Sequence, residues 1–266
     1  MIFCRIPLSN TDDNVYLDAY VADRVDGFTR KAIVVIPGGG YAKVCSSREG
    51  EPIAMAFMPY GYNAFVLHYS VNGATYPTQL IELAKAIKYV KDNADELNID
   101  PNNIFTVGFS AGGHLSASAG VLWKDKRVSE AIGVPAEYVK PRGTMLIYPV
   151  INGNYHSYSF KRLVGKEEPS QADIDMISID KNIDKDSSPA FILHTANDEI
   201  VDVRNSIEAA HAYATNGVPF ELHIYPDSPH GVALGNEITG SQNKNWIRPN
   251  IAEWVRMAAC WADKLK

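Results

Sequence analysis

The segment 104–112 constrains the fold most, because it places a G-x-S-x-G pattern between two different kinds of structure. Residues 104–107 are an apolar run typical of a buried strand, and helix-forming residues follow Gly112. A strand that turns at once into a helix needs glycines where a side chain would collide across the turn. Ser110, in the middle of this turn, is predicted to expose its hydroxyl at the top of a sheet and is the candidate nucleophile.

A nucleophilic serine needs a general base, because a free hydroxyl is a weak nucleophile at neutral pH. His230 fits this role, since it lies in a loop of turn-forming residues directly after a strand-like alternation at 220–225. His114, one turn after Ser110, is an alternative that we interpret as a buried hydrogen-bonding residue. We interpret the remaining histidines as structural residues within strands (His68, His194 and His223) or as surface residues (His156 and His211).

The base needs an acid that orients its imidazole, and this acid is expected on the loop after the preceding strand. Residues 190–194 form that apolar strand, and Asp198 lies just past its end. Asp198 is therefore the candidate acid. Glu199 and Asp202 are the alternatives, although Asp202 is better placed to cap the helix that follows.

Donors for a developing oxyanion are predicted in an early loop. An apolar run at 32–36 leads directly into Pro-Gly-Gly-Gly-Tyr at 37–41. A flexible turn is one interpretation of three successive glycines. The other is that bare backbone lets N–H groups approach a substrate oxygen, with Gly39, Gly40 and Ala111 as the donors.

Four residues near this loop are candidates for the rim of a site. Tyr41 is predicted to contact substrate, because an aromatic ring beside the donors can stack on a sugar or wall an acyl group. Arg48 is the second candidate for binding substrate, although it can instead form an ion pair with Glu49. Cys45 has no adjacent base and is expected to be inert packing.

Strand-like and helix-like segments alternate along the chain, which predicts an α/β fold with a mostly parallel sheet and helices on both faces. We expect residues 1–266 to form a single domain, with a helix at 78–96. Residues 100–103 are predicted to turn the chain into the strand before Ser110, and residues 171–177 are weakly periodic. Residues 152–188 are polar and irregular between two core strands. They are interpreted either as a small cap over the site or as a solvated insertion.

Composition excludes several classes of partner. The formal net charge is −6 and no basic run exceeds two residues, so nucleic acids and anionic membranes are not expected partners. Three cysteines without metal-type spacing suit a reducing compartment, and no secretory signal or membrane-spanning stretch is recognisable. These features predict a cytoplasmic protein, with no metal site, whose state of assembly, such as a homo-oligomer, the sequence leaves open.

Four motifs together resemble the α/β-hydrolase fold, and within it the small carbohydrate esterases of the acetyl-xylan-esterase-like and feruloyl-esterase-like branch. They are Pro-Gly-Gly-Gly-Tyr at 37–41, Ser-Arg-Glu-Gly-Glu-Pro at 47–52, Gly-Phe-Ser-Ala-Gly-Gly-His at 108–114 and His-Thr-Ala-Asn-Asp at 194–198. The chain order Ser110, Asp198, His230 is also the order of α/β-hydrolases. The loop differs from the His-Gly-Gly-Gly of lipases, which weakens assignment to that branch.

The resemblance implies hydrolysis of short acyl esters, acetyl above all, with no cofactor and with an acetylated oligosaccharide as substrate. An arylformamidase has a similar glycine loop and serine turn and is the alternative activity. A peptidase of the prolyl-oligopeptidase type would need a propeller that this chain has no room for. A binding protein that retains the fold without catalysis is the alternative of another class.

Overall fold

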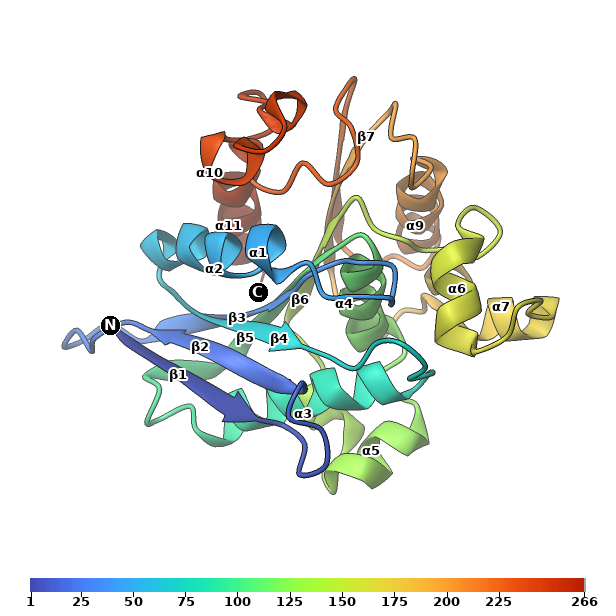
Figure 1. Ribbon diagram of the computed structural model, residues 1–266. Coiled ribbons are helices and arrows are strands. Elements are labelled where there is room, and N and C mark those ends of the chain that lie inside the picture. Colours follow the sequence, from blue (N-terminus) through green and yellow to red (C-terminus); the bar gives the residue numbers. More distant parts are fainter. Residues whose placement is uncertain (266) are drawn as a thin grey trace.

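Eight strands within residues 1–265, which are the residues described by this computed structural model, form one sheet in the order β1-β2-β4-β3-β5-β6-β7-β8 (Figure 1). The strands are β1 Ile2–Pro7, β2 Tyr16–Val21, β3 Arg30–Ile36, β4 Tyr62–His68, β5 Ile99–Phe109, β6 Gly143–Ile147, β7 Ala190–Thr195 and β8 Phe220–Tyr225. Strand β2 is antiparallel to both β1 and β4, and every pairing from β4 across to β8 is parallel. The predicted mostly parallel sheet is confirmed.

The segment 100–103 differs from its predicted place as a turn before a strand, because it lies inside β5. The register of β5 on β3 jumps from Ile99 opposite Arg30 to Ile104 opposite Ala32. Within the jump, the carboxylate of Asp100 accepts hydrogen bonds from Asn102 and Asn103. The expected turn chemistry is thus present, and it produces a bulge within the strand.

Helices cover both faces of this sheet, as predicted. The helices are α1 Ser46–Glu49, α2 Glu51–Phe57, α3 Thr78–Asp92, α4 Ala111–Val121, α5 Lys126–Ile132, α6 Ser157–Val164, α7 Gln171–Ile177, α8 Ile179–Asn182, α9 Arg204–Thr215, α10 Glu237–Gly240 and α11 Trp254–Lys264. Short 3₁₀ segments are η1 Met58–Tyr60, η2 Ala136–Val139 and η3 Lys244–Trp246. The predicted helix from Thr78 therefore ends at Asp92 and not at 96. None of the helices in residues 1–265 is both long and apolar enough to cross a membrane.

The pleat of the central strands divides the core into two layers. Val34 and Phe65 pack in the layer that contains the apolar side of α3, whereas Ile33 and Val66 pack in the layer that contains α2 and α11. Figure 1 shows α2 and α11 above the sheet and α3 and α5 below it. Alternate residues of one strand thus point to opposite faces, as period-two geometry requires.

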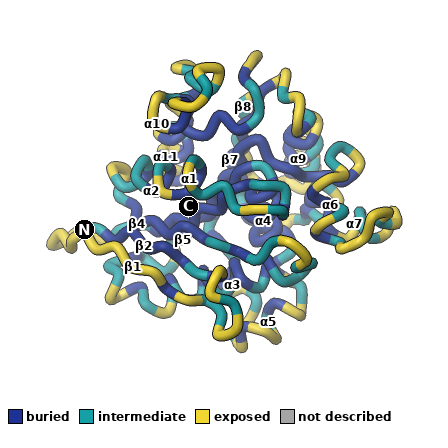
Figure 2. Tube along the Cα trace, viewed as in Figure 1, coloured by how far each residue is buried: buried dark blue, intermediate teal, exposed yellow. Residues whose placement is uncertain are grey.

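The segment 152–188 is folded into three short helices, α6, α7 and α8. Helix α7 has the bounds of its predicted periodic stretch and begins with a capping box between Ser170 and Asp173. Its neighbour α8 packs against α4 and α9, so this end of the segment joins the core. The outer turn between α6 and α7 is exposed in Figure 2.

The parallel strands deliver the candidate residues to one edge of the sheet. Ser110 follows β5, Asp198 follows β7 and His230 follows β8. Since the carboxyl ends of parallel strands lie at the same edge, three residues far apart in the chain become neighbours there.

Candidate active site

Ser110 occupies a strained turn that the surrounding backbone holds in place. Its φ of +54° and ψ of −118° are unusual for a residue with a side chain. Its N–H donates to Ile147 O at 3.0 Å, and its carbonyl accepts from the N–H of Val150 at 3.0 Å. A Cβ on Gly108 would stand 2.0 Å from the carbonyl oxygen of Gly112, so the turn has no room for a side chain there.

The structure brings Ser110, His230 and Asp198 together. The Nε2 atom of His230 lies 2.9 Å from Ser110 Oγ, and its Nδ1 lies 2.7 Å from Asp198 Oδ2. The other carboxylate oxygen of Asp198 accepts the N–H groups of Ile200 and Val201, each at 2.9 Å. The geometry is that of a nucleophile, a base and an orienting acid.

The carboxylate of Asp198 is completely buried, yet its surroundings favour the ionised form. Burial alone would raise the pKa of Asp198, but hydrogen bonds from His194 and His230 and the charge of His230 outweigh it and hold the pKa below its ordinary value. His194 is fixed by Ser206 Oγ at 2.7 Å and Val201 O at 3.0 Å, and its Nε2 lies 3.4 Å from Asp198. His194 is structural, as predicted, and also supports the acid.

The alternative acids lie elsewhere. Asp202 accepts the N–H of Arg204 at the start of α9 and pairs with its guanidinium, which fits the capping role predicted for it. Glu199 lies at the rim of the cavity described below. No hydrogen bond joins either carboxylate to His230 in the described part of the chain.

The glycine loop lies directly against Ser110. A Cβ on Gly38 would come within 3.0 Å of Ser110 Cβ. The Gly38 N–H is already occupied, since it donates to Glu49 Oε2 at 2.8 Å. By contrast, the N–H groups of Gly39 and Gly40 have no acceptor within residues 1–265. Both are therefore free to receive an oxygen from a ligand.

Tyr41 is predicted to contact substrate, but its side chain is buried and is not among the described residues that line the cavity near Ser110. Its φ of +58° turns the side chain into the protein, where it is 2% exposed. Its hydroxyl hydrogen bonds to His114 Nδ1 at 2.9 Å, and His114 Nε2 lies 2.8 Å from Ile177 O. Burial lowers the pKa of His114 to about 4, so its imidazole is neutral and structural, as predicted.

A cavity of about 520 Å³ opens above Ser110. It is lined by Gly39, Gly40, Cys45, Arg48, Glu49, Ser110, His156, Tyr158, Glu199, Ile200, His230, Gly231 and Trp246. The ring of Tyr158, from α6, lies so close to Gly40 that a Cβ there would be 2.5 Å from it. Segment 152–188 therefore contributes one wall of the cavity.

Two wall residues have roles that the sequence interpretation missed. His156, interpreted as a surface residue, faces the cavity and hydrogen bonds to Ile200 O at 3.1 Å, and burial is the main cause of its lowered pKa. Trp246 comes from η3, far along the chain, and donates from Nε1 to His230 O at 2.9 Å. No local pattern marks either residue, because only the tertiary fold brings them to Ser110.

Arg48 lines the cavity, but backbone groups already satisfy its guanidinium. Its Nε donates to Thr239 O at 2.9 Å, a terminal nitrogen bonds to Gly231 O, and the group stacks 3.5 Å from the centre of the Trp246 ring. The alternative prediction, an ion pair with Glu49, is wrong, because within residues 1–265 the Glu49 carboxylate binds Gly38 and Tyr148 instead. Arg48 thus acts on the shape of the cavity wall.

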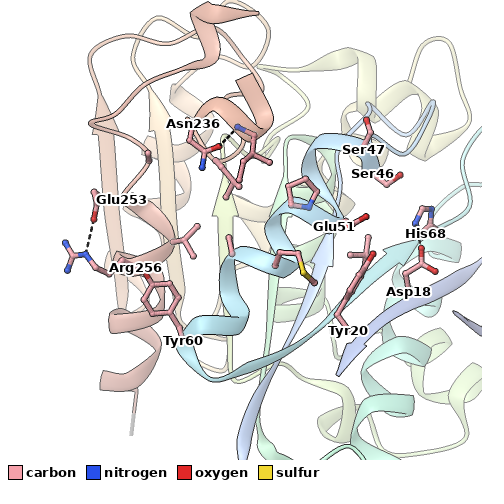
Figure 3. A pocket seen from close by; sticks show the side chains of 18 of the residues that line it. Asp18, Tyr20, Ser46, Ser47, Glu51, Tyr60, His68, Asn236, Glu253 and Arg256 are labelled. Atoms are coloured by element: carbon pink, nitrogen blue, oxygen red, sulfur yellow. Dashed lines mark hydrogen bonds and ion pairs between the residues drawn. The ribbon is translucent and has the colours of Figure 1, made fainter. Parts of the chain in front are cut away.

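A larger cavity of about 750 Å³ lies on the other side of α1, between β2, α2 and α11 (Figure 3). Its polar end carries Asp18, Tyr20 and His68, and its other end carries Tyr60 and Arg256. Ser110, Asp198 and His230 are not among the described residues that line it. Of these two cavities, the smaller one is therefore the one that Ser110 and His230 line.

A family model named BD-FAE matches residues 17–213, about three quarters of the chain and including both the glycine loop and the serine turn. The chain belongs to the BD-FAE family. The resemblance inferred from the four motifs is thereby confirmed.

Two relatives of this BD-FAE protein have names that refer to xylan. It is 34% identical to endo-1,4-beta-xylanase B of Butyrivibrio fibrisolvens over 80% of this chain, and 29% identical to acetylxylan esterase of Xylanibacter ruminicola over 85% of this chain. The alignments cover 34% and 45% of those two proteins, so the chain spans less than half the length of either.

Solved structures extend the similarity to the whole chain. A structure titled acetyl ester-xyloside bifunctional hydrolase, from Caldicellulosiruptor lactoaceticus, is 33% identical with a TM-score of 0.83, and the alignment covers 98% of this chain and 95% of that one. MGS-M1, an alpha/beta hydrolase from a deep-sea metagenome library, is 30% identical with a TM-score of 0.81, covering 100% and 98%. The predicted α/β-hydrolase fold is confirmed.

Proposed function

We propose that this protein is a serine esterase that hydrolyses short acyl esters, and that acetyl groups on carbohydrates are its substrates. The observation that carries the proposal is the continuous series of hydrogen bonds from Asp198 through His230 to Ser110, at 2.7 and 2.9 Å. These distances allow proton transfer without rearrangement of the protein.

In the proposed reaction, Ser110 Oγ attacks the ester carbonyl carbon while His230 Nε2 takes the hydroxyl proton. The bond from that carbon to the alcohol oxygen then breaks, and the alcohol leaves with the proton from His230. Water repeats the sequence on the acyl-enzyme and releases the acid. Asp198 holds the imidazole in the required tautomer throughout.

Three N–H groups are proposed to receive the oxyanion. Those of Gly39 and Gly40 have no acceptor within the described residues, and that of Ala111 belongs to the first residue of α4, where helical N–H groups have no partner in the helix. The occupied N–H of Gly38 leaves it out of this set. Each such donor typically contributes about 3–4 kcal/mol to transition-state stabilisation.

The preference for a small acyl group rests on the cavity wall. Tyr158 lies against Gly40, and Ile200 and Trp246 complete an apolar lining close to Ser110. We propose that the acyl group points at this wall, so that a long chain would meet these side chains. The carbohydrate part of the proposal is supported by the names of the relatives, which include an acetylxylan esterase and an acetyl ester-xyloside hydrolase.

The proposal is tested by kcat/KM on 4-nitrophenyl acetate, butyrate and octanoate. We expect kcat/KM to fall steeply from acetate to octanoate. Ser110→Ala should abolish hydrolysis of all three esters. Tyr158→Ala should raise butyrate relative to acetate about tenfold, since each methylene in an apolar pocket is worth about 1–3 kcal/mol. Tyr155→Ala, in the same segment but outside the cavity lining, is the matched control.

Two results would contradict the proposal. Absence of Ser110-dependent ester hydrolysis together with turnover of N-formylkynurenine would indicate an arylformamidase. Equal kcat/KM values on acetate and octanoate would contradict the preference for small acyl groups but not the esterase activity. Release of acetate from acetylated xylo-oligosaccharides then tests the carbohydrate part.

The cytoplasm is proposed as the location because the three cysteines, Cys4, Cys45 and Cys260, are all free thiols. Fractionation of cells that express the protein at its native level tests this, and recovery in the culture medium would contradict it.

A further inference from the structure

Two loops of the site are joined by a buried carboxylate that the proposed reaction does not use. Glu49 ends α1 and is 5% exposed. Its Oε2 accepts the N–H of Gly38 at 2.8 Å, and its Oε1 accepts the hydroxyl of Tyr148 at 2.8 Å. Both oxygens of one side chain are therefore held by donors from different parts of the fold.

Tyr148 continues the connection to the loop that carries His230. Its hydroxyl accepts the N–H of Ala233 at 3.1 Å, and its ring packs edge-on against the His230 imidazole with centroids 5.0 Å apart. Burial, and after it the negative charge of Glu49, raises the pKa of Tyr148 well above its ordinary value, so the hydroxyl retains the proton that it donates.

Helix α1 also holds the histidine loop through a second residue, Arg48. Arg48 bonds to Gly231 O and stacks on Trp246, which in turn donates to His230 O. One short helix thus contacts the oxyanion loop with Glu49 and the histidine loop with Arg48. Buried networks of this kind fix geometry when every member is satisfied, as here.

We infer that Glu49 is a positioning residue: through Gly38 and Tyr148 it sets the distance between the oxyanion donors and His230. The inference rests on the proposed esterase function. Gly38 is the residue before the donors Gly39 and Gly40, so the hydrogen bond to Glu49 fixes the direction in which the next two N–H groups point. A displacement of about 1 Å at such donors can cost about 100-fold in rate.

The connection from Gly38 through Glu49 and Tyr148 to Ala233 is tested first by amide hydrogen exchange, a measurement that does not depend on enzyme activity. In the wild type we expect the Gly38 and Ala233 amides to be protected. Glu49→Gln leaves one neutral acceptor oxygen for the two donors, so exchange at Gly38 should accelerate. Tyr148→Phe should expose Ala233 and accelerate exchange at Gly38 as well, because the two bonds share one carboxylate. Unchanged exchange at Gly38 in both variants would overturn the inference.

The effect on catalysis is tested with the same variants on 4-nitrophenyl acetate. Glu49→Gln should lower kcat about 10- to 100-fold and change KM less than about threefold, because ground-state binding does not use the oxyanion donors. The double variant should lose little more than Glu49→Gln alone, since both changes break one connection. Independent, multiplying losses would overturn the shared connection.

Matched controls separate positioning from general destabilisation. Glu82 is also a buried carboxylate, bound by the N–H and hydroxyl of Ser70 away from the site, and Tyr62 has a buried hydroxyl with no partner within residues 1–265. Glu82→Gln and Tyr62→Phe should leave kcat within about twofold. An equal loss of kcat in these controls would overturn the role of Glu49. A wild type without Ser110-dependent turnover would refute the proposed function instead. Amide exchange would still show whether Glu49 and Tyr148 connect the two loops.

Discussion

The environment of Asp198 explains how the imidazole of His230 is oriented. Its carboxylate has no exposed surface, and four groups surround it: the backbone N–H groups of Ile200 and Val201, and the imidazoles of His194 and His230. The backbone donors and His194 fix the carboxylate, and the fixed carboxylate fixes the imidazole of His230. In the proposed mechanism, the orientation of His230 therefore depends on Asp198, which is not among the described residues that line the cavity.

Asp198→Asn should lower kcat about 10⁴-fold, because the amide can donate to His230 Nδ1 and so stabilise the wrong tautomer. Asp202→Asn, four positions along the chain, removes a carboxylate that neither contacts His230 nor lines the cavity and should leave kcat nearly unchanged. Steady-state kinetics on 4-nitrophenyl acetate measures both. Similar losses in the two variants would mean that the local negative charge, and not the hydrogen bond, matters.

At the scale of elements, the glycine loop and α4 act as one unit around Ser110. Gly39 has a φ of +134°, and a Cβ there would stand 2.1 Å from the carbonyl oxygen of Lys43. Only glycine can hold this conformation and this approach together. The loop is therefore shaped by its backbone, which is the part that the proposed oxyanion site uses.

Gly39→Ala should reduce kcat by at least about 100-fold, the typical loss of one oxyanion donor. Gly73 is the control, since its φ of +107° is also left-handed but no heavy atom lies within 4 Å of a Cβ built there. Gly73→Ala should therefore affect stability alone. Equal kcat values for the two variants, from initial rates on the acetate ester, would argue against the role of Gly39.

His114 joins three elements, because it lies on α4, bonds to Tyr41 of the loop and reaches Ile177 at the end of α7. Its pKa is about 4 in the folded protein and about 6.5 in an unfolded chain. Between these values the unfolded chain binds a proton that the folded protein does not. Stability from this group is therefore complete above pH 6.5 and is lost as the pH falls towards 4.

From pH 7 to pH 5 this histidine should cost about 2 kcal/mol of the free energy of unfolding. His114→Gln cannot titrate, so the variant should lose less stability over the same interval, although it starts from a lower value. Urea unfolding at the two pH values measures the difference. An identical pH dependence in the variant would show that His114 does not titrate with unfolding.

At the scale of the whole molecule, the sheet and the positions of Ser110, Asp198 and His230 could be predicted because each lies in a local pattern next to a strand end. The residues that form the cavity wall could not be predicted in this way. Tyr158 comes from an irregular segment and reaches Gly40 only through the tertiary fold, and the turn of Tyr41 into the core depends on a left-handed backbone that its residue type does not favour. Glu49 looked like half of a surface ion pair, because nothing in the sequence reveals Tyr148 as its partner.

The proposed mechanism requires an acyl-enzyme on Ser110. The most direct measurement is mass spectrometry of the protein quenched in acid within milliseconds of mixing with 4-nitrophenyl acetate, with peptide mapping. We predict one acetyl group, on the peptide that contains Ser110, together with a burst of 4-nitrophenolate close to the enzyme concentration, and neither in Ser110→Ala. Ester turnover with no burst and no adduct, or an adduct on another residue, would contradict the account.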